Sequence, residues 1–301
     1  MNDTDYKELK KGGMMRQTEK GKFSVRLRIA GGRLTAEAMG VVKDVAERYG
    51  RGEIHLTARQ GIEIPNVNQD DLFRVKSELA AGGVKVGVCG PTVRTVTACQ
   101  GSKVCLRGVL DASGLADEVD RLYYGKPVPT KFKVGISGCV NNCLKAEEND
   151  IGVKGGREPG WNKNSCTYCG VCEAVCPADA IRVSEEEGRV HIDLEKCIYC
   201  GDCIIACPFG AMVEARRGFF VFAGGKFGRF PSLGRKIGRF FSGDSSLISI
   251  VRASIEFFRN YGTPRERFGN TIQRVGFEEF EKYVLDAIED GKDEKAARHN
   301  R

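Results

Sequence analysis

The chain has 301 residues, of which 41% are hydrophobic and 29% are charged, and its formal net charge is +7. This balance is typical of a globular protein with a sizeable core, and the length allows one to three domains. No apolar run approaches the roughly 18–20 residues that cross a bilayer, so we expect no membrane span. The N-terminal stretch is polar and mixed in charge, unlike a signal or transit segment, and we therefore expect a cytoplasmic protein.

The first 90 residues predict a small α+β module, over residues 21–90, which follows an N-terminal extension over residues 1–20. Apolar and polar residues alternate in some stretches, and apolar residues recur at helical spacing in others. The expected elements are a strand over 23–29, a helix from a Thr35 cap to Gly50, a strand or strand pair over 53–64, a helix from Asp70 or Asp71 to Gly82, and a strand over 84–88.

The remainder of the chain predicts a second α+β domain that is interrupted by an insert. Two helices are expected near its end, over 245–260 and 264–288, and Pro264 opens the second because proline is favoured at helix starts. The predicted boundaries are 91–158 and 214–288 for the second domain, 159–213 for the insert, and 289–301 for a frayed tail.

The 13 cysteines are the most unusual feature of the composition. Reducing compartments keep thiols reduced, so disulfides explain them poorly in a cytoplasmic protein. Because the chain has only three histidines, any metal chemistry must be mainly thiolate chemistry, which suits iron–sulfur clusters, zinc and cuprous copper. Cys89 stands apart from the other cysteines, and we predict that it is a small buried residue.

Eight cysteines lie in two runs with identical spacing, CTYCGVCEAVCP and CIYCGDCIIACP. This C-x2-C-x2-C-x3-C-P pattern is that of bacterial two-cluster ferredoxins, in which the fourth cysteine of each run binds the other run's [4Fe–4S] cube. A pair of zinc ribbons is the alternative, but it would use only four thiolates. We assign one cube to Cys166, Cys169, Cys172 and Cys207, and the other to Cys197, Cys200, Cys203 and Cys176.

Four further cysteines form two sparser pairs, Cys99 with Cys105 and Cys139 with Cys143. Neither pair suits a zinc site, whose usual C-x2–4-C pairs have matching partners. Taken alone, the second pair could be two buried structural cysteines on a turn of helix.

The stretch KFKVGIS comes just before the second pair and predicts a strand. Side chains alternate between the two faces of a strand, so Lys131 and Lys133 share one face with Gly135 and Ser137. The other face, directed at the core, carries Phe132, Val134 and Ile136. By itself, a K-x-K pair on a strand is more often a solvated surface than a site.

Taken together, C-x5-C followed by C-x3-C resembles the signature of the sirohaem-containing sulfite and nitrite reductases. The resemblance implies that these four cysteines bind a third [4Fe–4S] cube, and that Cys143 also bridges to the sirohaem iron. Matching segments run from about residue 23 to residue 285. Within the family, the chain most resembles the catalytic C subunit of anaerobic sulfite reductases and small proteins similar to dissimilatory sulfite reductase.

The resemblance also implies roles for polar residues. RLRIAGG and RTVTAC match segments with substrate-binding arginines, here Arg28 and Arg94, and KFK matches a pair of active-site lysines. LTARQ matches a sirohaem-contacting strand, which implies that Thr57 and Arg59 touch the cofactor. GGKFGRFP resembles a later cofactor-contacting loop, and the residues implied there are Gly224, Gly225, Lys226 and Arg229.

The predicted fold is α+β: a ferredoxin-like α/β sandwich module joined to a sirohaem and [4Fe–4S] binding domain, with a bacterial 2[4Fe–4S] ferredoxin insert. The predicted reaction is the six-electron reduction of sulfite to sulfide. Arginine holds oxyanions without donating protons, whereas a lysine with a lowered pKa can donate one. We therefore expect Arg28 and Arg94 to bind the substrate and Lys131 and Lys133 to supply protons.

Two alternatives stay open. A sirohaem nitrite reductase uses the same cofactor, although family members that reduce nitrite tend to carry asparagine where this chain has Lys133. A non-catalytic iron–sulfur electron carrier would not need the arginines and lysines assigned above. The basic stretch 216–240 could indicate RNA binding, but it lacks an aromatic stacking motif, and the carboxylates of sirohaem explain the arginines better. We expect no nucleic-acid partner.

The expected partners follow from what the chain lacks. Larger family members contain two related halves and this chain contains one, so we expect a homodimer or a hetero-oligomer that completes each site. The sequence has no flavin or nicotinamide fingerprint. Electrons are then expected from a protein, by resemblance an iron–sulfur subunit with a flavin-containing, NADH-oxidising subunit, or a ferredoxin.

Overall fold

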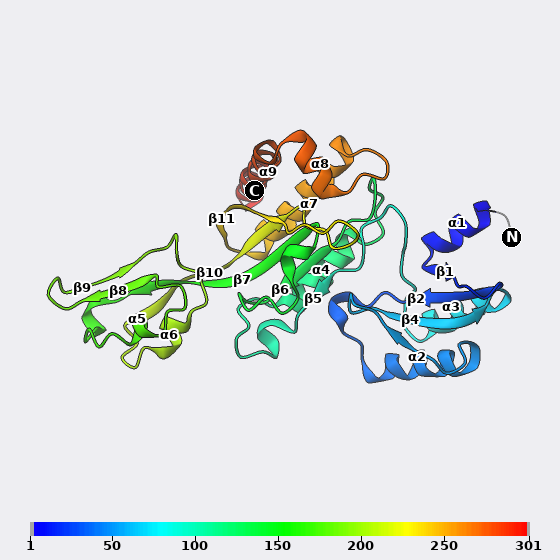
Figure 1. Cartoon of the computed structure of the whole chain (residues 1–301), viewed down its shortest axis with the longest axis horizontal. Helices are drawn as coiled ribbons and strands as arrows, with labels where there is room; N and C mark the ends of the chain where they lie inside the picture. The colour runs from blue at the N-terminus through cyan, green and yellow to red at the C-terminus, as the bar shows by residue number, and fades with distance from the viewer. Residues whose placement is uncertain (1–2, 300–301) are drawn as a thin grey trace.

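The computed structural model describes residues 3–299 and gives side-chain surroundings for residues 6–288. The N-terminal part is an antiparallel sheet with two helices packed on one face, and it lies at one end of the molecule (Figure 1). Its elements are α1 (Asp3–Lys11), β1 (Met14–Arg16), β2 (Lys22–Arg26), α2 (Ala36–Tyr49), β3 (His55–Leu56), β4 (Ile62–Asn68) and α3 (Leu72–Ala81). The strand order is β1-β2-β4-β3.

Helix α2 has the boundaries that the sequence predicts. Thr35 precedes it, and its hydroxyl oxygen accepts a hydrogen bond from the Ala38 amide at 3.2 Å. This bond satisfies one of the amides that a helix start leaves without a partner. The helix ends at Gly50, and its buried face, with Val42 and Val45, packs on the sheet.

The prediction of a strand over 84–88 was wrong. Only Val86 pairs, through one isolated bridge to Leu27. The edge of the sheet is instead β1, which lies in the segment expected to be an extension. Gly13, with φ +81°, lets the two backbones meet there, since a Cβ at this position would lie 2.6 Å from the Gly87 carbonyl oxygen. The backbone of residues 84–88 therefore supports the sheet without extending it.

The second part is a five-stranded mixed sheet, which occupies the middle of the molecule (Figure 1). Its strands are β5 (Thr97–Ala98), β6 (Val134–Ser137), β7 (Ile151–Trp161), β10 (Met212–Ala223) and β11 (Arg235–Phe241), in the order β11-β10-β7-β6-β5. The predicted core residues Phe132, Val134 and Ile136 are fully buried. Ser137 is buried as well, so β6 is covered on both faces.

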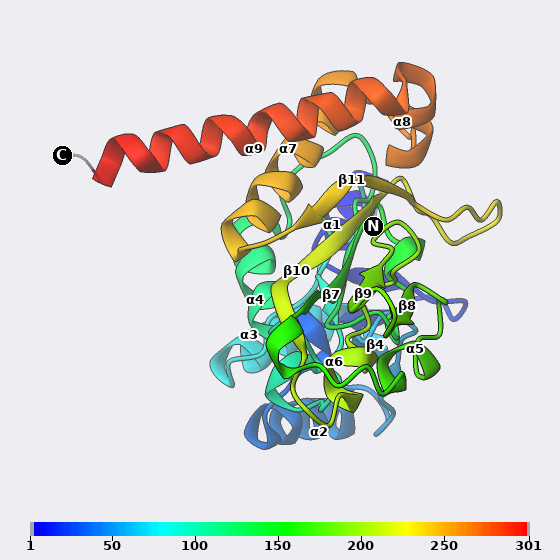
Figure 2. The same cartoon turned by 90° about the vertical axis from the view of Figure 1, so that its left-hand side faces the viewer.

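Four helices pack on this sheet and share its core. They are α4 (Ala112–Tyr123), α7 (Asp244–Tyr261), α8 (Phe268–Val275) and α9 (Phe277–His299). The helix predicted over 264–288 is in fact two, because Gly276 adopts φ +120° between them. Pro264 lies in a turn before α8, and α9 runs beyond residue 288 to His299 (Figure 2).

Residues 162–211 form a lobe at the far end of the long ribbon made by β7 and β10 (Figure 1). The lobe contains α5 (Val171–Ala174), α6 (Asp202–Ala206) and a hairpin of β8 (Ile181–Ser184) with β9 (Arg189–Ile192). Its small core includes Ile181 and Val190, and Met212, the first residue of β10, packs into it. Within residues 3–299, the structure contains no helix with the length and apolar character that a bilayer span requires.

One ion pair joins the N-terminal part to α4. Asp120 is 1% exposed, and its carboxylate accepts from Arg28 Nε at 2.7 Å and from the Val96 amide at 3.0 Å. The Arg28 guanidinium also lies over the Tyr124 ring, 4.0 Å from its centroid. A buried carboxylate needs such partners, so the contact is a structural one.

Asp120→Ala is expected to lower the free energy of unfolding by about 3 kcal/mol, because it leaves Arg28 and the Val96 amide without their acceptor. Asp117→Ala on the same helix is the matched control. Asp117 pairs with Arg33 at the surface, where both side chains are about half exposed, and its loss is expected to cost less than about 1 kcal/mol. Urea unfolding of both variants measures the difference, and equal losses would contradict the assignment.

Candidate functional site

A cavity of about 360 Å³ lies between the N-terminal part and the start of β5 and β6. Among the described residues, its lining includes five basic side chains and no acidic one. Thr57, Arg59, Arg94, Lys131 and Lys133, all predicted as site residues, meet here, and the remaining lining residues are Arg26, Leu27, Ile29, Ala58, Gly61, Val88 and Thr95. We call this site the cationic cavity.

Arg59 reaches the cavity from the loop between β3 and β4. Its Nη1 donates to Asn149 Oδ1 at 2.7 Å and its Nη2 donates to the Thr95 carbonyl at 3.3 Å. Burial, together with the nearby charge of Arg94, lowers the pKa of Arg59 to about 10, so it is still a cation at neutral pH. Both partners are neutral, and neither cancels its charge.

Arg94 is held by backbone carbonyls. Its Nη1 donates to the Val88 oxygen at 2.6 Å and its Nη2 to the Gly90 oxygen at 2.9 Å. Its Nε is buried and has no partner among the residues that the structure describes. A fixed guanidinium with an unused donor is suited to an oxyanion, which can accept bonds from the fork of N–H groups.

Lys131 and Lys133 lie just before β6, and both side chains line the cavity. Burial and the neighbouring Arg59 lower the pKa of Lys133 to about 8. Burial, followed by the charges of Arg267 and Arg94, lowers the pKa of Lys131. Lys133 can thus change its protonation state close to neutral pH, as a proton donor must.

Asp150 lies behind the lysines and was not predicted. Its fully buried carboxylate accepts from Arg267 at 2.9 and 3.0 Å and from the Lys133 backbone amide at 2.9 Å. Burial raises the pKa of Asp150, although Arg267 opposes this effect. The carboxylate is already occupied by these partners, so a net positive charge is left at the cavity.

Arg28, a predicted substrate-binding residue, does not line the cationic cavity, because Asp120 holds it elsewhere. Arg26 lines the cavity in its place, and its guanidinium binds Glu63 at 2.8 Å and Cys89 Sγ at 3.0 Å. Cys89 is buried, as predicted. The motif RLR contains both arginines, but its alternation alone does not show which of them meets the buried aspartate.

The loop predicted to touch sirohaem also lies outside the cationic cavity. A Cβ at Gly225 would come within 2.0 Å of the Glu147 carbonyl oxygen, so that glycine permits a close backbone contact. Gly224 donates its amide to the Asp150 carbonyl, and Lys226 Nζ donates to Asn270. Arg229 is exposed in the turn between β10 and β11.

A second cavity, of about 470 Å³, lies at the other end of β5 and β6. Cys99, Cys105, Cys139 and Cys143 line it together, as the sequence pattern groups them. Burial raises the pKa of Cys139, and the three neighbouring thiols add to this shift. The Gly138 amide donates to Cys99 Sγ at 2.9 Å, a bond that stabilises a thiolate. We call this site the thiol cavity.

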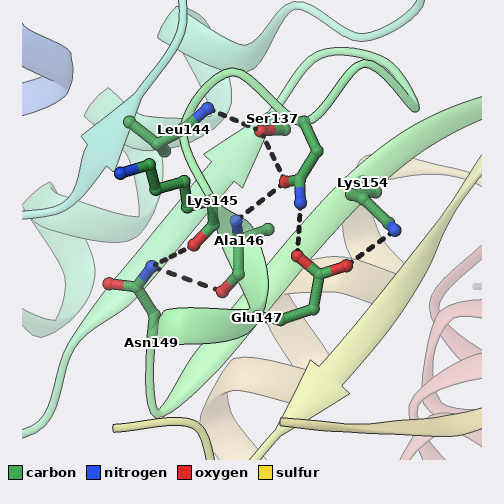
Figure 3. A network of polar contacts seen from close by, with 8 residues as sticks. Ser137, Leu144, Lys145, Ala146, Glu147, Asn149 and Lys154 are labelled. Atoms are coloured by element: carbon green, nitrogen blue, oxygen red, sulfur yellow. Dashed lines mark hydrogen bonds and ion pairs between the residues drawn. The ribbon is translucent and has the colours of Figure 1, made fainter. Parts of the chain in front are cut away.

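The loop that carries Cys139 and Cys143 is fixed by a network of hydrogen bonds to the Asn142 side chain, and Figure 3 labels its partners Ser137, Ala146 and Glu147. Asn142 Oδ1 accepts from the Ser137 hydroxyl at 3.2 Å and from the Ala146 amide at 2.8 Å. Its side-chain amide donates to Glu147, which pairs with Lys154 at 2.7 Å. Asn142 has φ +53°, a conformation that asparagine tolerates better than most residues.

In the lobe, the eight remaining cysteines gather in the two sets that their spacing predicts. Cys166, Cys169, Cys172 and Cys207 surround one small cavity. In the second set, burial raises the pKa of Cys203 to about 12, and the adjacent thiols Cys200, Cys197 and Cys176 reinforce the shift.

The thiols of the lobe accept hydrogen bonds from the backbone. Amide donors lie at 3.2 to 3.4 Å from Cys207, Cys176 and Cys197. Such bonds are typical of iron–sulfur sites. Among the side chains of residues 6–288, no three of His, Cys, Asp or Glu gather tightly enough for one metal ion.

The cationic cavity and the thiol cavity lie on opposite ends of the same strand. Strand β6, Val134–Ser137, separates Lys133 from the cysteine loop, and four extended residues span about 13 Å. One chain therefore does not place its own lysines beside its own Cys143.

Comparison with protein-family models identifies two matches. The nitrite and sulphite reductase 4Fe-4S domain matches residues 89–290, and the ferredoxin-like half domain of nitrite and sulfite reductases matches residues 15–82. The chain belongs to the nitrite and sulfite reductase family. The two matches divide the chain near Cys89, between the two sheets.

Two curated relatives are sulfite reductases. The coenzyme F420-dependent sulfite reductase of Methanocaldococcus jannaschii is 33% identical over 279 residues, which is 92% of this chain and 44% of the relative. The C subunit of the anaerobic sulfite reductase of Salmonella typhimurium is 31% identical over 176 residues, 54% of this chain and 52% of the relative. The chain thus spans about half the length of these relatives.

The fold matches a solved structure of the same family. The crystal structure of dissimilatory sulfite reductase I superposes with a TM-score of 0.72 at 22% identity, covering 87% of this chain and 69% of that one. This match supports the mixed α+β fold with a ferredoxin-like half domain.

Lys133→Met is expected to stabilise the protein by about 1–2 kcal/mol below pH 8. The reason is that the charged form of Lys133 is less stable in the buried site than in the solvated unfolded chain. The folded pKa is about 8 and the usual value is 10.5, so the gain is full below pH 8 and falls as the pH rises to 10.5. Urea unfolding at several pH values measures it. The same gain at every pH would contradict the lowered pKa, and exposed Lys43→Met serves as the control.

Proposed function

We propose that the chain is the catalytic subunit of a sulfite reductase, which reduces sulfite to sulfide with six electrons. The observation that carries this proposal is the cationic cavity, whose lining, among the described residues, holds five basic side chains and no carboxylate. Sulfite is a small dianion with three oxygen atoms that can accept hydrogen bonds. The sulfite reductases among the relatives support the choice of substrate.

The proposed roles follow from how each side chain is held. Arg94 and Arg59 are fixed by neutral acceptors and bind the oxyanion as permanent cations. Arg26, which lies at the cavity, replaces Arg28 as the third arginine of this clamp. Lys133 and Lys131 supply protons to the oxygens that leave as water, since their lowered pKa values favour proton release.

The residues present fit a sirohaem coupled to a [4Fe–4S] cube. The cavity's arginines can pair with sirohaem carboxylates, and Thr57 and Arg59 line the same surface. Cys99, Cys105, Cys139 and Cys143 line one cavity and would hold the cube, and Cys143, which is exposed, would be the thiolate shared with the sirohaem. When bound, the pair would supply the electrons for reduction of the substrate.

The lobe is proposed to be a ferredoxin-type insert with two further [4Fe–4S] cubes. Its two cysteine runs have the same spacing, and each places a positive-φ tyrosine and glycine at the same points, Tyr168 with Gly170 and Tyr199 with Gly201. This internal repeat is what two equivalent cubes require. With the cube of the thiol cavity, the proposed total is three.

A complete site is proposed to need a second chain. The lysines and the bridging cysteine lie at opposite ends of β6, so the thiol cavity of one copy would meet the cationic cavity of another. We favour a second copy of this chain, because it carries both missing parts, and a related subunit is the alternative. Electrons are proposed to come from a partner protein, either iron–sulfur and flavin subunits that oxidise NADH or a ferredoxin.

The direct test is anaerobic purification from cells that make sirohaem, followed by an optical spectrum and an assay with reduced viologen. A sirohaem spectrum and one sulfide formed per six electrons are expected, with sulfite preferred over nitrite. Ammonia formed from nitrite, with no sulfide from sulfite, would identify a nitrite reductase. Clusters without a tetrapyrrole band would instead identify an electron carrier, and either result would overturn the proposal.

A further inference from the structure

We infer that the two cubes of the lobe have different places in the electron route. The cube held by Cys197, Cys200, Cys203 and Cys176 is the immediate donor to the cube of the thiol cavity, and electrons cross strand β7 at Gly155 and Gly156. The cube held by Cys166, Cys169, Cys172 and Cys207 is the outer one. This inference rests on the proposed function, since it requires three bound cubes.

The first observation is a pair of glycines on β7 that face opposite ways. A Cβ at Gly155 would lie 2.4 Å from the Gly138 carbonyl oxygen, and Gly138 donates its amide to Cys99 Sγ. A Cβ at Gly156 would lie 3.0 Å from the Cβ of Tyr199. Both cysteine loops therefore press against the backbone of β7 at adjacent residues, and a single strand separates them.

The second observation is how firmly the Tyr199 loop is attached to the sheet. The Arg157 amide donates to the Tyr199 carbonyl at 2.9 Å. The Tyr199 ring is 8% exposed and packs on Phe240 and Phe220, with centroids 4.6 and 4.9 Å apart. These contacts fix the distance between the Cys197–Cys203 loop and β7.

An ion pair also connects the thiol cavity with the Cys197–Cys203 loop. Arg107, two residues after Cys105, pairs with Asp202, which lies between Cys200 and Cys203. Among the residues that the structure describes, the other cysteine loop of the lobe has no ion pair of this kind to the thiol cavity. The hydrogen bonds that the structure shows for residues 166–176 all stay within the lobe, for example from the Val183 amide to Glu173 and from the Ala180 amide to Cys176.

The step is a single-electron transfer. The inner cube of the lobe is oxidised by one electron, the cube of the thiol cavity is reduced by one, and no bond or proton moves. The inner cube is then reduced again by the outer cube, which receives electrons from a low-potential one-electron donor protein. In the test, reduced methyl viologen takes the place of that donor.

The first experiment compares Gly156→Val with Gly160→Val by freeze-quench electron paramagnetic resonance after mixing with reduced viologen. Gly160 is the matched control, because its Cβ would meet Ala215 of the neighbouring strand at 3.1 Å and no cysteine loop. The G156V variant is expected to reduce the cube of the thiol cavity several-fold more slowly, since it pushes the Tyr199 loop away. Equal rates in both variants, with all cubes bound, would overturn the inference.

A second experiment measures magnetic relaxation instead of rate, in the fully reduced protein. A nearby paramagnetic cube speeds the magnetic relaxation of the cube in the thiol cavity. In Cys169→Ser, which removes the outer cube, the inner cube is still present and this faster relaxation is expected to persist. In Cys203→Ser it is expected to disappear, and the reverse pattern would overturn the inference. Iron and sulfide analysis of the unaltered protein shows first whether three cubes are bound, so failure of the proposed function is recognised separately.

Discussion

The cationic cavity depends on one buried carboxylate, Asp150. Its side chain accepts from Arg267, which directly precedes α8, and from the Lys133 amide, and its carbonyl accepts from Gly224. The adjacent residue, Asn149, binds Arg59 of the N-terminal part. Four separate segments of the chain thus converge on two consecutive residues. Because Asp150 is saturated by these contacts, it stabilises the basic cluster without neutralising the cavity, and the remaining charge is available to an anion.

The position of β6 in the sheet explains why the cationic cavity and the thiol cavity lie apart in this chain. Side chains before the strand reach the cationic cavity, and those after it reach the thiol cavity. A strand that is buried on both faces cannot bend to bring its ends together. The same rigid sheet extends through β7 and β10 to the lobe, so the cysteine loops are held at fixed places along one scaffold.

The sequence predicts those parts of the site in which chemistry depends on local spacing. The two dense cysteine groups, the shared face of Lys131 and Lys133, and the burial of Phe132 follow from residue order, whereas the set of Cys99, Cys105, Cys139 and Cys143 was implied by the family resemblance. Residue order does not predict that Arg26, and not Arg28, lines the cationic cavity. That outcome depends on Asp120, which is distant in sequence and buried by tertiary packing. Asp150 and Arg267 were missed for the same reason, and β1 was missed because its three residues are too few to show a period.

The central claim is that two chains share each site, and complementation tests it most directly. A Lys131→Met, Lys133→Met double variant and a Cys143→Ser variant, each inactive alone, would be co-expressed with different tags and purified through both. A mixed dimer has one site with both defects and one with neither, so sulfide formation is expected to return. A doubly tagged complex that carries its cofactors and forms no sulfide would contradict the account.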